Sequence, residues 1–307
     1  MTTSTNQTWR EGWSEGDVLA NGIRQHYYRI GADSEKPPLL LLHGFTENGP
    51  CWSRVANALA PQYDVIMLDA RGHGRSAGPE TGYSQALLTQ DVVTAITALD
   101  LRHPIVFGYS NGAVTAAQVA AAAPELVRAV VVEDPPWSEA PWRPQATQAG
   151  AGEPWPGYTA WYNAWVNWHI ALRTQTLEER IAASQQFLPP GALDWPGEEL
   201  ATHLEAQAQF NLDVLDHVPP LPVKAPWRAT VEQITCPILL LTAGGDRMPS
   251  VSPQEVEQIN ATWRHGQHVA FPDATHFLHH ELQGAQFERF ISVLNTFLRA
   301  ARESEPV

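Results

Sequence analysis

The sequence predicts an α/β domain in which a mostly parallel sheet carries helices on both faces, with a helical cap inserted after the sixth strand. Three observations predict this class. Short aliphatic runs alternate with helical patterns over both end regions of the 307-residue chain. The motif Gly108-Tyr109-Ser110-Asn111-Gly112 stands between one such run and a helical pattern. The alternation stops between residues 137 and 232, which are rich in tryptophan, proline and alanine.

The first predicted elements are a hairpin and two buried strands. Residues 17–20 and 23–30 flank Asn21-Gly22, a pair that favours a type I′ turn between antiparallel strands. Residues 39–42 are all leucine, as expected of a parallel strand that is covered on both faces. A second buried strand follows at 64–69.

The remaining elements alternate in type. A helix over 83–99 precedes a strand at 104–107, and the small residues after Gly112 predict another helix. Further strands are expected at 127–133, 237–242 and 268–271. The segment 283–300 has apolar residues at helical spacing and is predicted to close the fold as a helix.

The interruption divides the predicted fold into three parts. These are a first part of the core (1–136), the cap (137–232) and a second part of the core (233–307). The cap holds eight of the twelve tryptophans. Because Trp161, Trp165 and Trp168 lie at i, i+4 and i+7, they share one helix face, which favours packing inside the cap.

Composition limits the classes of partner and compartment. A formal charge of −14 argues against nucleic acid and anionic membranes, which bind basic patches. The two cysteines, Cys51 and Cys236, follow no metal or redox spacing and suit a reducing compartment. The polar start lacks signal-peptide features, and no apolar run has the length of a membrane span. We expect a cytoplasmic protein with a small-molecule substrate, and the aromatic cap leaves a homo-oligomer open.

The motif around Ser110 is typical of a nucleophile elbow. Gly-x-Ser-x-Gly between a strand and a helix places the serine on a sharp turn, where its hydroxyl is lifted clear of the sheet. A serine hydroxyl needs a base to take its proton as it attacks. His276, in the loop after the last strand, is the predicted base, and His279 and His280 compete with it.

Two aspartates are candidates for the acid that orients this base. Asp246 follows the strand after the cap, which is the commonest position in this architecture, and Asp134 ends the strand before the cap. Both strand ends lie at the same edge of the predicted sheet, so either carboxylate could reach the histidine.

An oxyanion hole and a substrate pocket complete the predicted site. The backbone amides of Phe45 and Asn111 are the expected oxyanion donors. Gly44 and Tyr109 are expected to border the substrate, and Trp137 and Trp142 to form the lip of the pocket. We expect neither a metal ion nor an organic cofactor.

Taken in chain order, these motifs resemble the α/β-hydrolase fold superfamily. The resemblance depends on His43-Gly44-Phe45, the turn from Asp69 to Ser76, the serine motif, an acid and His276. It implies a serine hydrolase with a helical cap and makes the turn around His73 a structural element.

A narrower resemblance concerns the acid and the substrate. Glu133-Asp134-Pro135-Pro136 and the segment around His276 are similar to a branch that includes zearalenone-type lactonases. In that branch the acid follows the sixth strand, which implies Asp134, with Glu133 as second choice. The chain departs from those lactonases in its His-Gly-Phe loop and in offering Asp246.

The expected reaction is hydrolysis of a carboxylic ester or lactone through an acyl-serine, with an apolar or aromatic substrate such as a resorcylic lactone. A carbon–carbon bond hydrolase or an iminopeptidase of the same fold is the alternative within the enzymes. A receptor that binds a small molecule without turnover is the alternative outside them.

Overall fold

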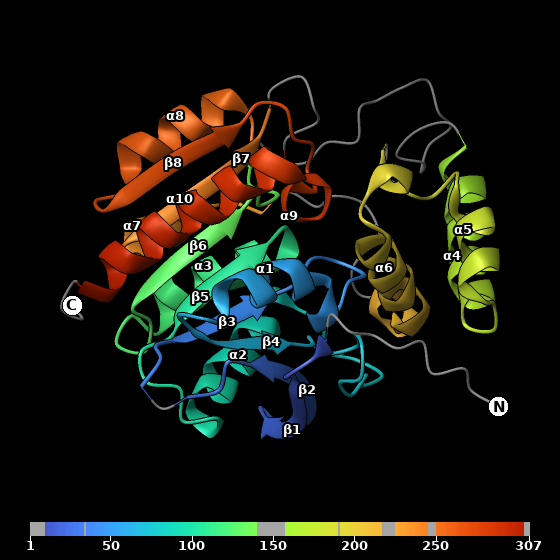
Figure 1. Ribbon diagram of the computed structural model, residues 1–307, viewed down its shortest axis with the longest axis horizontal. Coiled ribbons are helices and arrows are strands. Elements are labelled where there is room, and N and C mark those ends of the chain that lie inside the picture. Colours follow the sequence, from blue (N-terminus) through green and yellow to red (C-terminus); the bar gives the residue numbers. More distant parts are fainter. Residues whose placement is uncertain are drawn as a thin grey trace.

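The fold is built around one eight-stranded sheet (Figure 1). The computed structural model describes residues 10–33, 35–139, 157–189, 191–216, 225–244 and 250–303. The strand order is β1-β2-β4-β3-β5-β6-β7-β8. The strands are β1 (Ser14–Ala20), β2 (Ile23–Ile30), β3 (Pro38–Leu42), β4 (Asp64–Leu68), β5 (Ile105–Tyr109), β6 (Ala129–Glu133), β7 (Ile238–Ala243) and β8 (Gly266–Phe271). Strands β3 to β8 run parallel, which confirms the predicted mostly parallel sheet.

The antiparallel part of the sheet is the predicted hairpin. Strand β1 pairs with β2, and β2 pairs antiparallel with β4. Asn21 (φ 47°) and Gly22 (φ 79°) both adopt the left-handed region, as a type I′ turn requires. The predicted Asn-Gly turn therefore lies where the sequence indicated.

Side chains alternate along the strands and separate the core into two layers. Leu40 and Val106 pack on one face with the helices α2 (Gln85–Ala98), α3 (Asn111–Ala122), α7 (Arg228–Gln233) and α8 (Pro253–Thr262). Leu39 and Phe107 pack on the other face with α1 (Ser53–Leu59) and α10 (Gly284–Glu303). Figure 1 shows α1 and α10 on the near side of the sheet. This period of two confirms the helices-on-both-faces arrangement.

Of the helices between β6 and β7, α7 packs against the sheet, and the others form a third layer beside it (Figure 1). They are α4 (Tyr158–Leu172), α5 (Leu177–Ser184), the short 3₁₀ turns Ala192–Asp194 and Leu212–Asp216, and α6 (Gly197–Gln209). Trp165 and Trp168 are buried there with Leu204, and the ring of Trp161 stacks 6.0 Å from that of Trp165. The tryptophan stripe therefore packs within these helices.

Hydrogen bonds join this layer to the loops that follow β3 and β4. Asn48 Nδ2 donates to Gln209 Oε1 (3.0 Å), and the Asn211 amide donates to the Gly72 carbonyl (2.9 Å). Helix α6 thus lies over the carboxyl ends of the strands, where ligands of parallel sheets bind. The two ends of the predicted cap segment do not join this layer: Trp137 and Trp227 pack in the core layer of α3 and α7. The division into core and cap stays a prediction.

The 3₁₀ turn Gly49–Trp52 and the short helix α9 (Leu278–Glu281) complete the elements around the strand ends. Among the described helices, none is both long enough and apolar enough to cross a membrane.

Candidate active site

Ser110 occupies a strained turn between β5 and α3. Its backbone angles are φ 51° and ψ −117°, an unusual conformation for a residue with a side chain. The turn needs glycine on both sides. A Cβ on Gly108 would lie 2.1 Å from the Gly112 carbonyl oxygen, and one on Gly112 would lie 2.2 Å from the Leu42 carbonyl oxygen. The two glycines therefore let strand, turn and helix cross closely enough to present the serine hydroxyl.

A line of hydrogen bonds connects Ser110 to a histidine and a carboxylate. His276 Nε2 lies 3.0 Å from Ser110 Oγ, and His276 Nδ1 lies 2.6 Å from Asp134 Oδ2. Asp134 follows β6 and His276 follows β8. With the Nδ1 proton donated to the carboxylate, Nε2 turns a lone pair toward the serine hydroxyl, the arrangement that a general base needs.

Asp134 is held in place by a residue that the sequence did not reveal. Its side chain is fully buried, and the Ser250 amide donates to Asp134 Oδ2 over 2.8 Å. Ser250 Oγ also lies 3.0 Å from His276 Nδ1. No motif marks Ser250 in the sequence. The other candidate acid, Asp246, lies outside the described residues.

Glu133, the second choice for the acid on β6, faces a different histidine. Glu133 Oε1 accepts the His279 amide (3.1 Å) and lies 2.8 Å from His279 Nδ1. Burial raises the pKa of Glu133 to about 8 and lowers the pKa of His279 well below its ordinary value. His279 and His280, which competed with His276 for the role of base, belong to α9 and are buried. Their ring nitrogens face the carboxylates of Glu133, Glu199 and Glu47, whereas His276 faces Ser110.

The loop after β3 is fixed by side chains on both sides. His43 Nε2 accepts the Ala70 amide (3.0 Å), which leaves the proton on Nδ1 to be donated to the Gly44 carbonyl (2.8 Å). The Gly44 amide donates to Glu47 Oε2 (2.9 Å). A Cβ on Gly44 would lie 2.7 Å from the ring of Tyr109, so glycine allows this loop to pass the elbow strand. The amides of Phe45 and Asn111 belong to these two turns, and their oxyanion role stays a prediction.

Aromatic rings lie beside His276 and beside the loop after β3. The Tyr109 and Phe277 rings lie 5.0 and 5.3 Å from that of His276. The Phe45 ring lies 5.4 Å from that of Phe210, which packs with Trp165 and Leu204. The layer of α4 and α6 therefore contacts the loop after β3 through aromatic packing.

The expected tryptophan lip requires a correction. Trp137 is 1% exposed and packs with Trp227 in the core layer of α3 and α7, and its backbone forms a parallel bridge with Ala225. Trp142 lies outside the described residues. His73 is buried, its Nδ1 lies 2.8 Å from the Arg71 carbonyl, and burial lowers its pKa to about 3; its structural role stays a prediction.

The comparison with known proteins agrees with this geometry. A family model described as alpha/beta hydrolase fold matches residues 37–281. The chain belongs to this family. It is 36% identical over 174 residues to N-formylmaleamate deformylase of Pseudomonas putida, covering 53% of this chain and 64% of the relative. It is 38% identical over 98 residues to 2-(acetamidomethylene)succinate hydrolase of Mesorhizobium japonicum, covering 32% and 35%. The aligned parts thus span less than two thirds of either relative.

A solved structure shares the fold of this α/β hydrolase. The crystal structure of N-formylmaleamic acid deformylase from Pseudomonas putida S16 superposes with a TM-score of 0.73. The match covers 92% of this chain and 100% of the other, at 23% sequence identity.

Proposed function

We propose that this chain is a serine-dependent hydrolase that cleaves a carboxylic ester or lactone through an acyl-serine intermediate. The line from Ser110 through His276 to Asp134 carries the proposal. The 3.0 Å between Ser110 Oγ and His276 Nε2 suits transfer of the serine proton to the histidine. The 2.6 Å between His276 Nδ1 and Asp134 Oδ2 suits a hydrogen bond that orients the ring. Asp134 is the proposed acid, in preference to Asp246.

In the first half-reaction, Ser110 Oγ attacks the carbonyl carbon while its proton moves to His276 Nε2. Asp134 stabilises the imidazolium that forms, and the amides of Phe45 and Asn111 stabilise the oxyanion. The carbon–oxygen bond then breaks, and the alkoxide leaving group takes the proton from His276.

Water completes the cycle in the same geometry. His276 removes a proton from a water molecule as its oxygen attacks the acyl carbon. The tetrahedral intermediate collapses, Ser110 Oγ recovers the proton and the carboxylic acid is released. A lactone yields one ring-opened hydroxy acid in place of two products.

The surroundings favour an apolar or aromatic substrate. The ring of Phe277, which is half-buried, lies 5.3 Å from that of His276, and the half-buried Phe45, in the loop after β3, packs against Phe210. Flat apolar groups pack well against such rings.

Hydrolysis of an N-acyl bond is the second candidate. Two relatives are named for N-formylmaleamate and for 2-(acetamidomethylene)succinate, which both carry an acylated nitrogen. The same triad serves this reaction when His276 protonates the departing nitrogen.

Initial rates on a substrate panel test the proposal and separate the candidates. The panel holds p-nitrophenyl acetate, a longer aryl ester, dihydrocoumarin, a resorcylic macrolactone and N-formylmaleamate, each with wild type and Ser110→Ala. We expect serine-dependent turnover that is fastest on the aromatic esters or lactones. Fast turnover of N-formylmaleamate alone would favour the second candidate, and no serine-dependent turnover at all would overturn both.

A further inference from the structure

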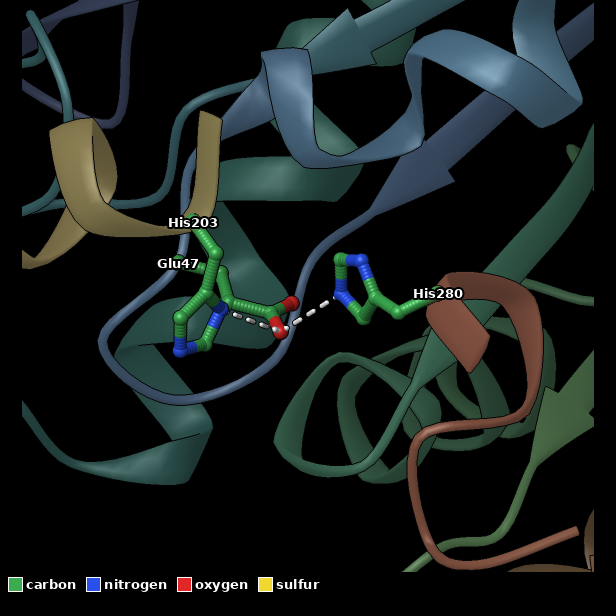
Figure 2. Close-up of side chains that lie close together, drawn as sticks. All are labelled: Glu47, His203 and His280. Carbon is green, nitrogen blue, oxygen red and sulfur yellow. Dashed lines mark hydrogen bonds and ion pairs between the residues drawn. The ribbon is translucent and has the colours of Figure 1, made fainter. Parts of the chain in front are cut away.

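A buried polar cluster that the proposed reaction does not use lies between the core and helix α6. Glu47 comes from the loop after β3, His280 from α9, and His203 and Glu199 from α6. Each of the four is at most 5% exposed. Figure 2 shows the Glu47 carboxylate placed between the imidazoles of His203 and His280.

Two carboxylates contact the two ring nitrogens of His280. His280 Nδ1 lies 2.8 Å from Glu199 Oε2, and Nε2 lies 3.0 Å from Glu47 Oε1. Two carboxylates therefore face one imidazole in the interior, and this group of three has a net negative charge even when the ring carries a proton.

His203 brings an unused nitrogen to the same carboxylate. Its Nδ1 has no hydrogen-bond partner within the described part of the chain and lies 3.8 Å from Glu47 Oε1, beyond hydrogen-bonding reach. A buried nitrogen aimed at a carboxylate but too far to bond it leaves room for a bridging group.

The orientation of the Gln207 side-chain amide determines which nitrogen of the His203 ring carries the proton. One side of its amide lies 2.8 Å from His169 Nε2, and the other lies 3.2 Å from His203 Nε2 and 2.8 Å from Thr46 Oγ1. With the amide oxygen toward His169, the neutral ring of His169 must turn its bare Nδ1 to the Trp165 carbonyl, 2.9 Å away. That contact is repulsive.

Exchanging the amide oxygen and nitrogen of Gln207 removes the conflict. His169 then donates from Nδ1 to the Trp165 carbonyl and accepts the Gln207 amide at Nε2. The Gln207 oxygen accepts from Thr46 and from His203 Nε2. The proton of His203 is thereby fixed on Nε2, and Nδ1 points a lone pair into the cluster.

We propose that Glu47, His203 and His280 bind one divalent transition-metal cation, with Zn²⁺ the best match to two imidazole nitrogens and a carboxylate oxygen. One ligand atom from each residue lies within 4.8 Å of the other two. Metal–ligand bonds of about 2.0–2.2 Å place tetrahedral ligands about 3.4 Å apart, close to the 3.0 and 3.8 Å measured from Glu47.

Charge and hydrogen bonding also suit a cation at this point. The metal takes the place of the proton on His280 Nε2, which is released to solvent, and the charge of two carboxylates is then balanced. Glu199 accepts from His280 Nδ1 and forms the carboxylate–histidine–metal arrangement typical of such sites. Trp195 stacks 4.8 Å from the His280 ring and covers the cluster.

The ligands come from three parts of the chain that meet at the proposed active site. Glu47 lies in the loop after β3, which carries the proposed oxyanion donor Phe45; His280 follows His276 by four residues, and His203 belongs to α6. The cation would hold these segments together and position them without touching substrate. No pattern in the sequence indicated this cluster, because residues 47, 203 and 280 have no ligand spacing.

Metal uptake by the full-length chain tests the site. The protein is treated with a chelator, dialysed against Zn²⁺ or Co²⁺, and its metal content and the visible absorption of the Co²⁺ form are measured. We expect one cation per chain, a Co²⁺ spectrum typical of nitrogen and oxygen ligands, and a higher Tm with metal. Glu199→Gln is expected to weaken binding by about 10–100-fold, and His203→Gln to abolish stoichiometric uptake.

His268→Gln is the matched control, because His268 is a half-buried histidine on β8 that bonds Thr242 outside the cluster. It should bind metal as the wild type does, and so should Ser110→Ala, which separates this test from the test of the proposed reaction. Wild type that takes up no stoichiometric cation overturns the proposal even if the His203 variant fails to fold. Unchanged uptake in folded His203→Gln overturns it as well.

Discussion

Replacement of Asp134 by asparagine is the sharpest test of the proposed triad. Asp134 Oδ2 accepts two donors, the Ser250 amide at 2.8 Å and His276 Nδ1 at 2.6 Å. Asp134→Asn changes one carboxylate oxygen into NH₂ at nearly constant size. The variant therefore removes the charge that stabilises the imidazolium and leaves the packing in place.

The structure sets limits on the loss. If the amide oxygen takes the Oδ2 position, both hydrogen bonds survive but lose their charge assistance. A charged acceptor strengthens each bond by about 1 kcal/mol over a neutral one, so the two bonds together lose about 1.5–3 kcal/mol, which corresponds to a ~10–10²-fold loss in kcat. If NH₂ takes this position, the Ser250 amide loses its acceptor and His276 is forced into the wrong tautomer, which costs about 10⁴. We therefore expect kcat to fall by between about 10 and 10⁴-fold.

The assay compares kcat for wild type, Asp134→Asn and Asp246→Asn on the substrate that wild type turns over fastest. Circular dichroism and Tm establish that each variant is folded. Asp246→Asn is the matched control and should keep kcat within about threefold of wild type, a change below 1 kcal/mol. An inactive Asp246→Asn beside an active Asp134→Asn would refute the assignment.

Four further predictions concern the nucleophile, the elbow, the core and one buried carboxyl group. Ser110→Ala should lower kcat by at least about 10³-fold with an unchanged Tm, and residual turnover near the wild-type rate would contradict the mechanism. Gly112→Ala should fail to fold or lose most of its Tm, because the new Cβ would meet the Leu42 carbonyl at 2.2 Å, whereas Gly197→Ala, with open space, should not. Trp137→Ala should lower the free energy of unfolding, measured in urea, by about 3–5 kcal/mol. Unchanged stability together with slower hydrolysis of bulky esters would show instead that Trp137 lines the substrate pocket. Burial raises the pKa of Glu133 from 4.5 to about 8, so the free energy of unfolding should fall as pH rises between these values, by at most about 5 kcal/mol. In Glu133→Gln the free energy of unfolding, measured in urea, should depend less on pH. The same pH dependence in both proteins would argue against the raised pKa.

Much of the fold could be predicted because the residues of each strand reflect how that strand is buried. A parallel strand covered on both faces is apolar at every position, so residues 39–42 could be predicted as a buried strand from their own sequence alone. The Asn-Gly turn and the serine elbow are equally local, since each depends on backbone conformations that few residues adopt. For this reason predicted strand ends differ from the observed ones by at most three residues.

The contacts that tie the site together are not local, and the sequence could not show them. Ser250 meets Asp134 across 116 positions, and Glu47 meets His280 across 233. The same limit explains Trp137, whose position just after Asp134 indicated a pocket lip. Its backbone pairs with Ala225, a partner that no pattern near residue 137 reveals.

The adjacent carboxylates at the end of β6 show how backbone geometry separates two roles that the sequence leaves together. Glu133 is the last residue of the strand and pairs with Tyr109 and Leu241, whose side chains belong to the layer of α1 and α10. Alternation turns Glu133 to that layer, where it meets His279. Asp134 leaves the strand with φ 41°, and its carboxylate reaches Ser250 and His276. Glu133 is thus buried against His279, and its own pKa is raised, while Asp134 is placed to orient the base. A shift of the strand register by one residue would exchange the positions of the two carboxyl groups.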